Sequence, residues 1–305
     1  MVNTKSLGSF AHEQNIEGLS EPSLKAVMNN KSGYTVEKAQ RFLSFQQRIN
    51  KELLTHPVIE NNAFCKWFEK GELSKKEVQD FVIQFSVFSN LFLIAQLKKT
   101  INADTLEGMR ASKEILANEI GVVFKKPDAK AKSLKTDAGI DAELASAEGS
   151  VEGGTFRFRA AHFEWLLRMA EQLDLTFDDL GKRRHGTEPT LFFCDELSRL
   201  YGSEDYMISQ AASYAVENWA AAGFWDELVN GFTIYNKKSK SNLTLAFFTW
   251  HAKIEAQHAA HTQEELEELF FEREVDEDKF IKDGYEMLDG VNAFWVGLNE
   301  QRLSS

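Results

Sequence analysis

Residues 74–101 constrain the fold of this chain more than any other segment. Ser74 and Glu77 stand in the S-x-x-E pattern of a capping box, which predicts that a helix begins here. The run that follows, "EVQDFVIQFSVFSNLFLIAQLKKTI", is apolar on nearly every side of a helix. A helix with that pattern is expected to be buried. The segment therefore predicts a long helix in the core of the protein.

Most of the remaining chain is also helical in pattern. Between residues 35 and 57, apolar residues recur three or four positions apart, and the pattern stops at Pro57. Another helix is predicted to run from Asp104, a candidate cap, to Gly121. Further helices are expected at about residues 156–175, 190–201, 205–222, 224–236, 241–271 and 276–300. We find no convincing strand pattern, so the predicted fold class is all-α, with more than six helices.

Two segments interrupt the helical pattern. Residues 1–35 are rich in Ser, Asn and Gly and are expected to form a partly irregular N-terminal arm, with one short helix capped by Ser20. Residues 125–154 contain no aromatic residue, and lysines crowd the first half while acidic residues crowd the second. This composition predicts a mobile polar insertion. Residues 36–305 are expected to form a single helical domain around that insertion.

Charge and composition exclude several classes of protein. The 305 residues carry a formal net charge of −12, which argues against non-specific binding to nucleic acid or to an anionic membrane surface. No apolar run approaches the length expected for a bilayer span, and the N-terminus has no apolar signal core, so we expect a cytoplasmic protein. Cys65 and Cys194 are far apart in sequence and are expected to be free thiols.

The stretch "WHAKIEAQHAAH", residues 250–261, carries the most specific polar pattern. An ideal helix turns about 100° per residue, so His251, Glu255 and His258 would lie within an arc of about 60° on one face. His261 fits that face less well. The pattern is open to two interpretations: half of a metal site, or a helix face whose polar groups are satisfied by neighbouring residues or water.

Three more ionisable residues stand among apolar neighbours. They are Glu119 in "ILANEIG", His162 in "RAAHFEWLL" and Glu217 in "ASYAVENWAAAG". Burying a lone charge is costly, so such residues are normally paired with another charge or bound to metal. Each one alone is more simply explained by an ordinary core hydrogen bond or ion pair. Three histidines with three glutamates would suit a two-metal site, and this set of ligands favours iron or manganese.

The order of these residues resembles the haem-oxygenase-like diiron oxidases, which share a fold with haem oxygenase, the TenA proteins and PqqC. The resemblance covers about residues 40–300, with "NEIG" and "AHFEWLL" matching the first ligand pair and residues 251–258 matching a late H-x₃-[DE]-x₂-H helix. It implies a haem-oxygenase-like bundle of about seven or more core helices. It also implies that two Fe²⁺ ions are bound by a set of six metal ligands: Glu119, His162, Glu217, His251, Glu255 and His258.

The resemblance also implies a function. O₂ would be the co-substrate, and a small organic molecule would undergo N-oxygenation, C–H cleavage, or oxidative fragmentation or decarboxylation, in specialised biosynthesis. The expected partners are a small-molecule substrate and a second copy of the chain, as a homodimer. Glu217 would bridge the metals. The sequence departs from the family at one point, because the first histidine normally follows the first glutamate by about two helical turns. Here the gap runs from position 119 to position 162, across the insertion.

Other members of the same fold class remain as alternatives. Haem oxygenase needs an axial histidine near the first helix, and His56, just before Pro57, is more simply structural. A TenA-like hydrolase needs a nucleophilic cysteine, for which Cys194 is the only candidate; its sequence neighbours include no His or basic residue to lower its pKa. A non-enzymatic interaction protein with this fold is the alternative from a different class.

Overall fold

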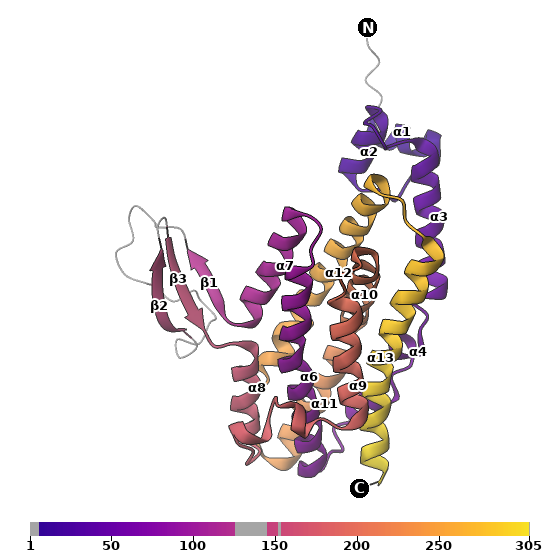
Figure 1. Ribbon diagram of the computed structural model, residues 1–305. Coiled ribbons are helices and arrows are strands. Elements are labelled where there is room, and N and C mark those ends of the chain that lie inside the picture. Colours follow the sequence, from indigo (N-terminus) through magenta and orange to yellow (C-terminus); the bar gives the residue numbers. More distant parts are fainter. Residues whose placement is uncertain (1–5, 126–144, 152–153, 305) are drawn as a thin grey trace.

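The computed structural model describes residues 6–125, 145–151 and 154–304, and it gives the backbone but not the side chains of residues 107, 123–125, 145–151, 154–159 and 254–261. Within this part of the chain, helices predominate (Figure 1). The longest are α6 (Lys75–Ile101), α12 (Ala246–Glu272) and α13 (Glu277–Ser304). Around them lie the mid-length helices α3 (Val36–Glu52), α7 (Leu106–Glu119), α8 (His162–Glu171), α9 (Glu188–Glu196), α10 (Tyr206–Ala220) and α11 (Phe224–Ser239).

Helix α6 is the predicted core helix. Ser74 and Glu77 form the expected capping box, and the first two thirds of the helix are largely buried. Its C-terminal part differs from the prediction, because Ile94, Leu97 and Ile101 are exposed. The helix is long and apolar enough, by length and composition, to cross a membrane, contrary to the sequence analysis. However, 56% of its most apolar window is buried inside the protein, as in an ordinary core helix.

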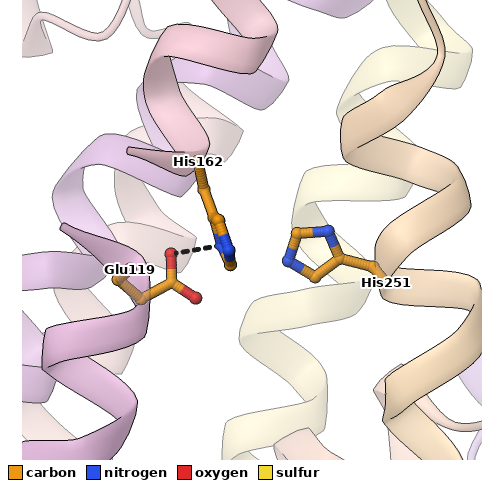
Figure 2. A group of neighbouring side chains, drawn as sticks. All are labelled: Glu119, His162 and His251. Carbon is orange, nitrogen blue, oxygen red and sulfur yellow. Dashed lines mark ion pairs between the residues drawn. The ribbon is translucent and has the colours of Figure 1, made fainter. Parts of the chain in front are cut away.

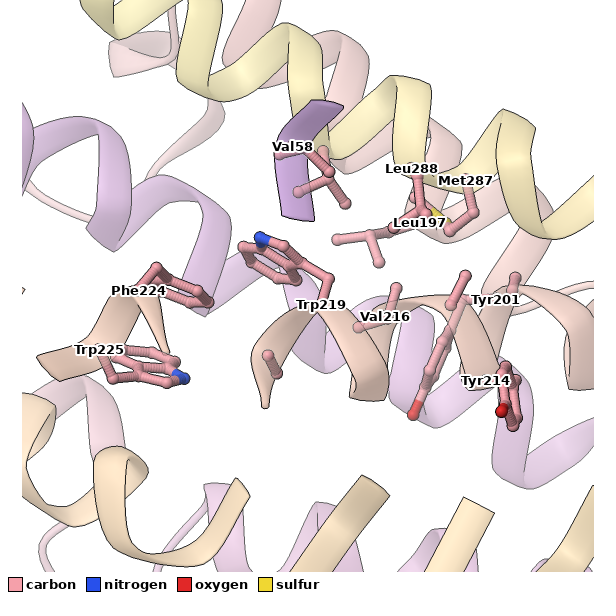
Figure 3. Packing of buried hydrophobic residues seen from close by; sticks show 14 of the residues in the cluster. Val58, Leu197, Tyr201, Tyr214, Val216, Trp219, Phe224, Trp225, Met287 and Leu288 are labelled. Atoms are coloured by element: carbon pink, nitrogen blue, oxygen red, sulfur yellow. The ribbon is translucent and has the colours of Figure 1, made fainter. Parts of the chain in front are cut away.

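Aromatic side chains fill the space around α6. Phe81 and Phe85 contact Phe248 on α12 and Trp295 on α13, with ring centroids 5.6 to 6.5 Å apart. On the other side of the core, Val216 and Trp219 of α10 face Met287 and Leu288 of α13 (Figure 3). Full burial of one large apolar side chain contributes about 1.5–3 kcal/mol, so this aromatic core is a large share of what holds the helices together.

The N-terminal arm is more regular than predicted. It contains two short helices, α1 (Leu7–Gln14) and α2 (Glu21–Met28), and only the second was expected. Ser20 caps α2 as predicted. Its backbone N–H and hydroxyl also donate to the carboxylate of Glu267 on α12, which is 4% exposed. These hydrogen bonds satisfy a buried charge and attach the arm to the bundle.

Short elements connect the longer helices. The connections include α4 (Pro57–Glu60), α5 (Ala63–Phe68), two 3₁₀ turns, η2 (Phe177–Asp179) and η3 (Arg183–His185), and one π-helical turn, η4 (Leu197–Tyr201). The cap of α7 differs from the prediction: Thr105, not Asp104, accepts the hydrogen bond of the Gly108 N–H. Asp104 instead pairs with Arg273. The predicted end of α7 is confirmed, because Gly121 follows it with φ = +74°.

Three strands form next to the insertion, where the sequence analysis found none. They are β1 (Val122–Lys125), β2 (Ala145–Val151) and β3 (Gly154–Arg159), and they form an antiparallel sheet in the order β1-β3-β2. The insertion predicted at 125–154 is therefore partly sheet. Residues 126–144 and 152–153 lie outside the described part of the structure, so its predicted mobility stays a prediction.

The sheet returns the chain close to the point where it left the bundle. Val122 of β1 pairs with Phe158 of β3, so the end of α7 and the start of α8 meet across the ladder. Figure 1 shows α7 and α8 on either side of the point from which the sheet projects. Both helices pack against α6. The long gap in sequence between Glu119 and His162 thus corresponds to a short separation in space.

Candidate metal centre

Three of the predicted ligands come together at the junction of α7, α8 and α12. Glu119, His162 and His251 each offer one ligand atom, and these atoms lie within 4.8 Å of one another (Figure 2). Nδ1 of His162 lies 3.1 Å from Oε2 of Glu119, and the two imidazole centroids are 4.9 Å apart. His162 and His251 are 6% and 8% exposed. All three residues are among the ligands predicted from the sequence, and they come from three separate segments.

Glu119 and His162 owe their positions to helix ends. Glu119 is the last residue of α7, two residues before Gly121, and His162 is the first residue of α8. Glu164 accepts a hydrogen bond from the Ala161 N–H, which fixes the first turn of α8 and the direction in which His162 leaves it. Glu119 and His162 are far apart in sequence. The pairing of β1 with β3 brings the two ends of the intervening segment together, so both residues can reach one site.

His251 is held by its own helix and by aromatic rings. Its Nδ1 lies 2.7 Å from the Phe247 carbonyl oxygen, which can only accept, so Nδ1 carries the proton and the lone pair lies on Nε2. This is the arrangement by which proteins usually orient a metal-binding histidine. Trp225 of α11 stacks on the imidazole at 4.7 Å, and Phe247 contacts it at 4.3 Å.

The residues present fit a metal ion. Nδ1 of His162 is buried and has no hydrogen-bond partner in the described structure, although it lies close to the Glu119 carboxylate. A buried ring nitrogen of this kind is costly unless something coordinates it. Two imidazoles with one carboxylate form a common ligand set of non-haem iron, and zinc enzymes use the same types of ligand.

The other three predicted ligands are not part of the cluster that the structure describes. Glu217 lies on α10, is 8% exposed, and is not among the three residues whose ligand atoms cluster in the described part of the chain. The side chains of Glu255 and His258 lie outside the described residues. The backbone of α12 is helical throughout residues 251–258, so the spacing on which their shared face depends is present. Their ligand roles stay predictions.

The aromatic residues beside the proposed ligands in the sequence have mixed roles. Phe247 contacts both histidines of the cluster, whereas Phe248 is fully buried among other aromatic rings. Trp219 stacks on Phe224 in the core, and Trp250 is 45% exposed. Most of them are therefore ordinary core or surface residues.

His56 is a structural residue, as its place before Pro57 indicated. It is 2% exposed, its Nδ1 accepts from the Val58 N–H at 3.2 Å, and its Nε2 lies 3.1 Å from Asp289. Both ring nitrogens are occupied, so the side chain is not available as an axial haem ligand.

Sequence reasoning missed two residues near the site. Trp225, which stacks on His251, is the second residue of α11 and has no signal in spacing or composition. Lys99 lies near the end of α6, where lysines commonly face the solvent beside the last turn. Its inward position becomes visible only when α10 and η4 are packed against α6.

Comparison with known proteins gives the fold. No family model matches the chain, and no curated protein matches its sequence. Among solved structures, a domain of unknown function with a haem-oxygenase-like fold from Shewanella denitrificans OS217 superposes with a TM-score of 0.55 at 13% identity, over 86% of this chain and 93% of that one. The chain has the haem-oxygenase-like fold. A TenA homologue from Pseudomonas syringae pv. tomato DC3000 matches equally well, at 12% identity with the same coverage and TM-score.

These matches confirm the predicted fold class. At such low identity they describe the architecture and not the chemistry, so they do not distinguish a metal oxidase from a TenA-like enzyme. The evidence for chemistry lies in the side chains, above all in the cluster of Glu119, His162 and His251.

Proposed function

We propose that this protein is a non-haem diiron enzyme that uses O₂ to oxidise a small organic substrate. The observation that supports the proposal most is the buried cluster of Glu119, His162 and His251, because its members come from three elements that the fold must bring together. One Fe²⁺ would be held by these three residues. The second would be held by His258 and Glu255, with Glu217 bridging the two.

The protein's own residues define how such a centre would work. The Phe247 carbonyl accepts a hydrogen bond from Nδ1 of His251, so that Nε2 would be the atom that holds the metal. Trp225 and Phe247 cover the imidazole and keep water from its faces. When bound, the iron pair would supply the reduction of O₂ and the oxidation of the substrate. The three carboxylates would neutralise most of the metal charge and leave coordination positions open.

The first experiment is metal stoichiometry. Protein loaded anaerobically with Fe(II), then desalted, should retain two iron equivalents per chain and consume O₂ when exposed to it. One equivalent would indicate that only the triad of Glu119, His162 and His251 binds metal, and would contradict the diiron assignment. Zinc retained in preference to iron, with no O₂ uptake, would contradict the oxidase.

Glu217→Ala should lower iron retention from two equivalents to one or fewer and abolish O₂ uptake, because a bridging carboxylate serves both metals. Glu204→Ala, a change at an exposed acid before α10, is the matched control and should retain both iron equivalents. Iron content and an oxygen electrode measure the two effects. Normal stoichiometry and normal uptake in Glu217→Ala would contradict the bridging role.

A TenA-like hydrolase is the second candidate, favoured by the structural match to a TenA homologue. Its cysteine nucleophile is not apparent here. Burial, reinforced by the nearby negative charge of Asp195, raises the pKa of Cys194 to about 12, and burial raises the pKa of Cys65 well above its usual range. A thiol must lose its proton to attack. Both thiols therefore stay protonated and unreactive at neutral pH, which weighs against this candidate.

Alkylation should show the same behaviour directly. In folded protein at pH 7.5, iodoacetamide should label Cys65 and Cys194 at least about 100-fold more slowly than in guanidinium-unfolded protein, because burial both shields the thiols and keeps them protonated. Mass spectrometry of tryptic peptides would give the two rates separately. Rapid labelling of Cys194 in folded protein would revive the nucleophile and the TenA-like reaction.

A further inference from the structure

Lys99 is a half-buried cation next to the proposed metal centre. It lies on α6, and its ammonium group donates a hydrogen bond to the hydroxyl of Ser213 on α10. It also lies over the ring of Tyr201, 4.5 Å from the centroid. Burial lowers the pKa of Lys99, while the negative charges of Glu265 and Glu217 act in the opposite direction. The two carboxylates thus offset part of the cost of partly burying this positive charge.

The described part of the protein offers the Lys99 ammonium group fewer hydrogen-bond acceptors than the group has donors. It has three N–H donors, and Ser213 is its only hydrogen-bond acceptor in the described part of the structure. No described carboxylate lies within ion-pair distance of it, so Glu265 and Glu217 stabilise it only from farther away. Its two remaining N–H donors are therefore available to water or to an anionic ligand.

The surroundings of Lys99 are rigid and already hydrogen-bonded. Tyr201 donates to Gln96 Oε1 at 2.6 Å, and Gln96 Nε2 donates to the backbone oxygen and the hydroxyl of Ser112, each at 2.8 Å. Tyr201 ends the π-helical turn η4, an irregularity that often marks functional sites. Because these groups satisfy one another, they hold the ammonium in place and leave two of its donors for a ligand.

The position of this cluster relative to the proposed metal ligands follows from two observations. Ser213 and Glu217 are four residues apart on α10, so they share one face of that helix. The negative charges of Glu217, Glu265 and Glu119 contribute, after burial itself, to the raised pKa of Tyr201. Lys99 therefore lies beside a region that both Glu119 and Glu217 border.

We propose that Lys99 binds the carboxylate of the substrate and holds the organic chain of that substrate against the metal centre. That the bound molecule is a substrate rests on the proposed function. A carboxylate fits better than a phosphate, since a single ammonium and a hydroxyl match a monoanion, whereas phosphate sites combine several cationic groups. The substrate class is then an organic acid, and neutral analogues bind poorly.

The test uses metal-free protein, so that it does not depend on iron or on turnover. Acetate, benzoate and octanoate are compared with their amides by calorimetry in wild type, Lys99→Met and Lys98→Met. Lys98 is the matched control, because its ammonium donates to Ser198 and it is exposed. In wild type and Lys98→Met, at least one acid should bind roughly tenfold more tightly than its amide. In Lys99→Met this preference should fall to about twofold or less.

Several outcomes would overturn the assignment. These are equal binding of acid and amide in wild type, a preference that survives in Lys99→Met, or inorganic phosphate displacing the acids more effectively than they displace it.

Thermal unfolding gives an independent readout. Without ligand, Lys99→Met should be at least as stable as wild type, since a half-buried charge with no close counter-ion is removed. A clearly lower Tm would make Lys99 a structural counter-ion instead. Loss of iron binding with intact acid preference would refute the oxidase but not this site.

Discussion

Replacing His162 or His251 with alanine should weaken Fe(II) binding at one site by at least about 100-fold while leaving the helical content unchanged. Loss of a residue that merely orients a ligand already costs about 10–100-fold in metal affinity, so loss of a ligand should cost at least that much. The fold should survive because each variant removes one polar side chain at the edge of the aromatic core and leaves the apolar core residues in place.

Anaerobic calorimetry with Fe(II) measures the affinity, and circular dichroism measures the helices. His12→Ala is the control, because His12 is a surface residue whose side chain is 84% exposed. Glu119→Gln should behave like the two histidine variants, although less severely, since the amide oxygen still coordinates weakly. Unchanged affinity and stoichiometry in both histidine variants would show that the cluster is a buried hydrogen-bonding group and not a metal site.

The sequence predicts the local part of this site well. Capping patterns and helix periodicity depend on residues three or four positions apart, and they placed α6, α10, α12 and α13 within a few residues. Asp104 and Thr105 show the limit of that precision: both are good caps, and Asp104 is recruited by Arg273 from the distant end of α12. Such a contact with a residue far away in sequence leaves no trace in the local capping pattern.

The non-local part of the site could not be predicted from the sequence. Nothing in the residues between Glu119 and His162 shows that Val122 will pair with Phe158, because strands in a polar, Gly-containing segment carry a weak alternating pattern. Yet this pairing brings the two residues together. Lys99 and Trp225 were missed for a related reason. Each acquires its role from a neighbour on another helix, Ser213 for Lys99 and His251 for Trp225.

The fold itself was more predictable than the chemistry. A helix that is apolar on most sides requires other helices around it, and this requirement alone favours a layered all-α bundle. Which reaction the bundle carries out depends on a few side chains at its interior, and the same architecture serves proteins of different function. The inward-facing Glu119, His162, His251 and Lys99 are therefore better guides to function than the overall match.

Gly231→Ala should destabilise the protein by about 3 kcal/mol, although alanine is normally the better helix former. Gly231 lies inside α11, where α5 crosses so closely that an added Cβ would meet the Phe68 carbonyl oxygen at 2.2 Å and its ring at 2.7 Å. A typical gain in helix propensity is only about 1 kcal/mol. Overpacking costs about 1–3 kcal/mol or more, and here the obstructing atom is backbone that cannot rotate away.

Gly8→Ala is the matched control, because Gly8 lies in α1 with no atom within 4 Å of an added Cβ, so no loss of stability is expected. Denaturant unfolding gives the free energies of unfolding for both variants.

The substitution at Gly231 should also weaken Fe(II) binding, since pushing α11 away from α5 shifts Trp225, the residue that packs on His251. Wild-type stability in Gly231→Ala would mean that α5 and α11 lie farther apart than described. Lost stability with unchanged metal affinity would mean that Trp225 does not position the histidine.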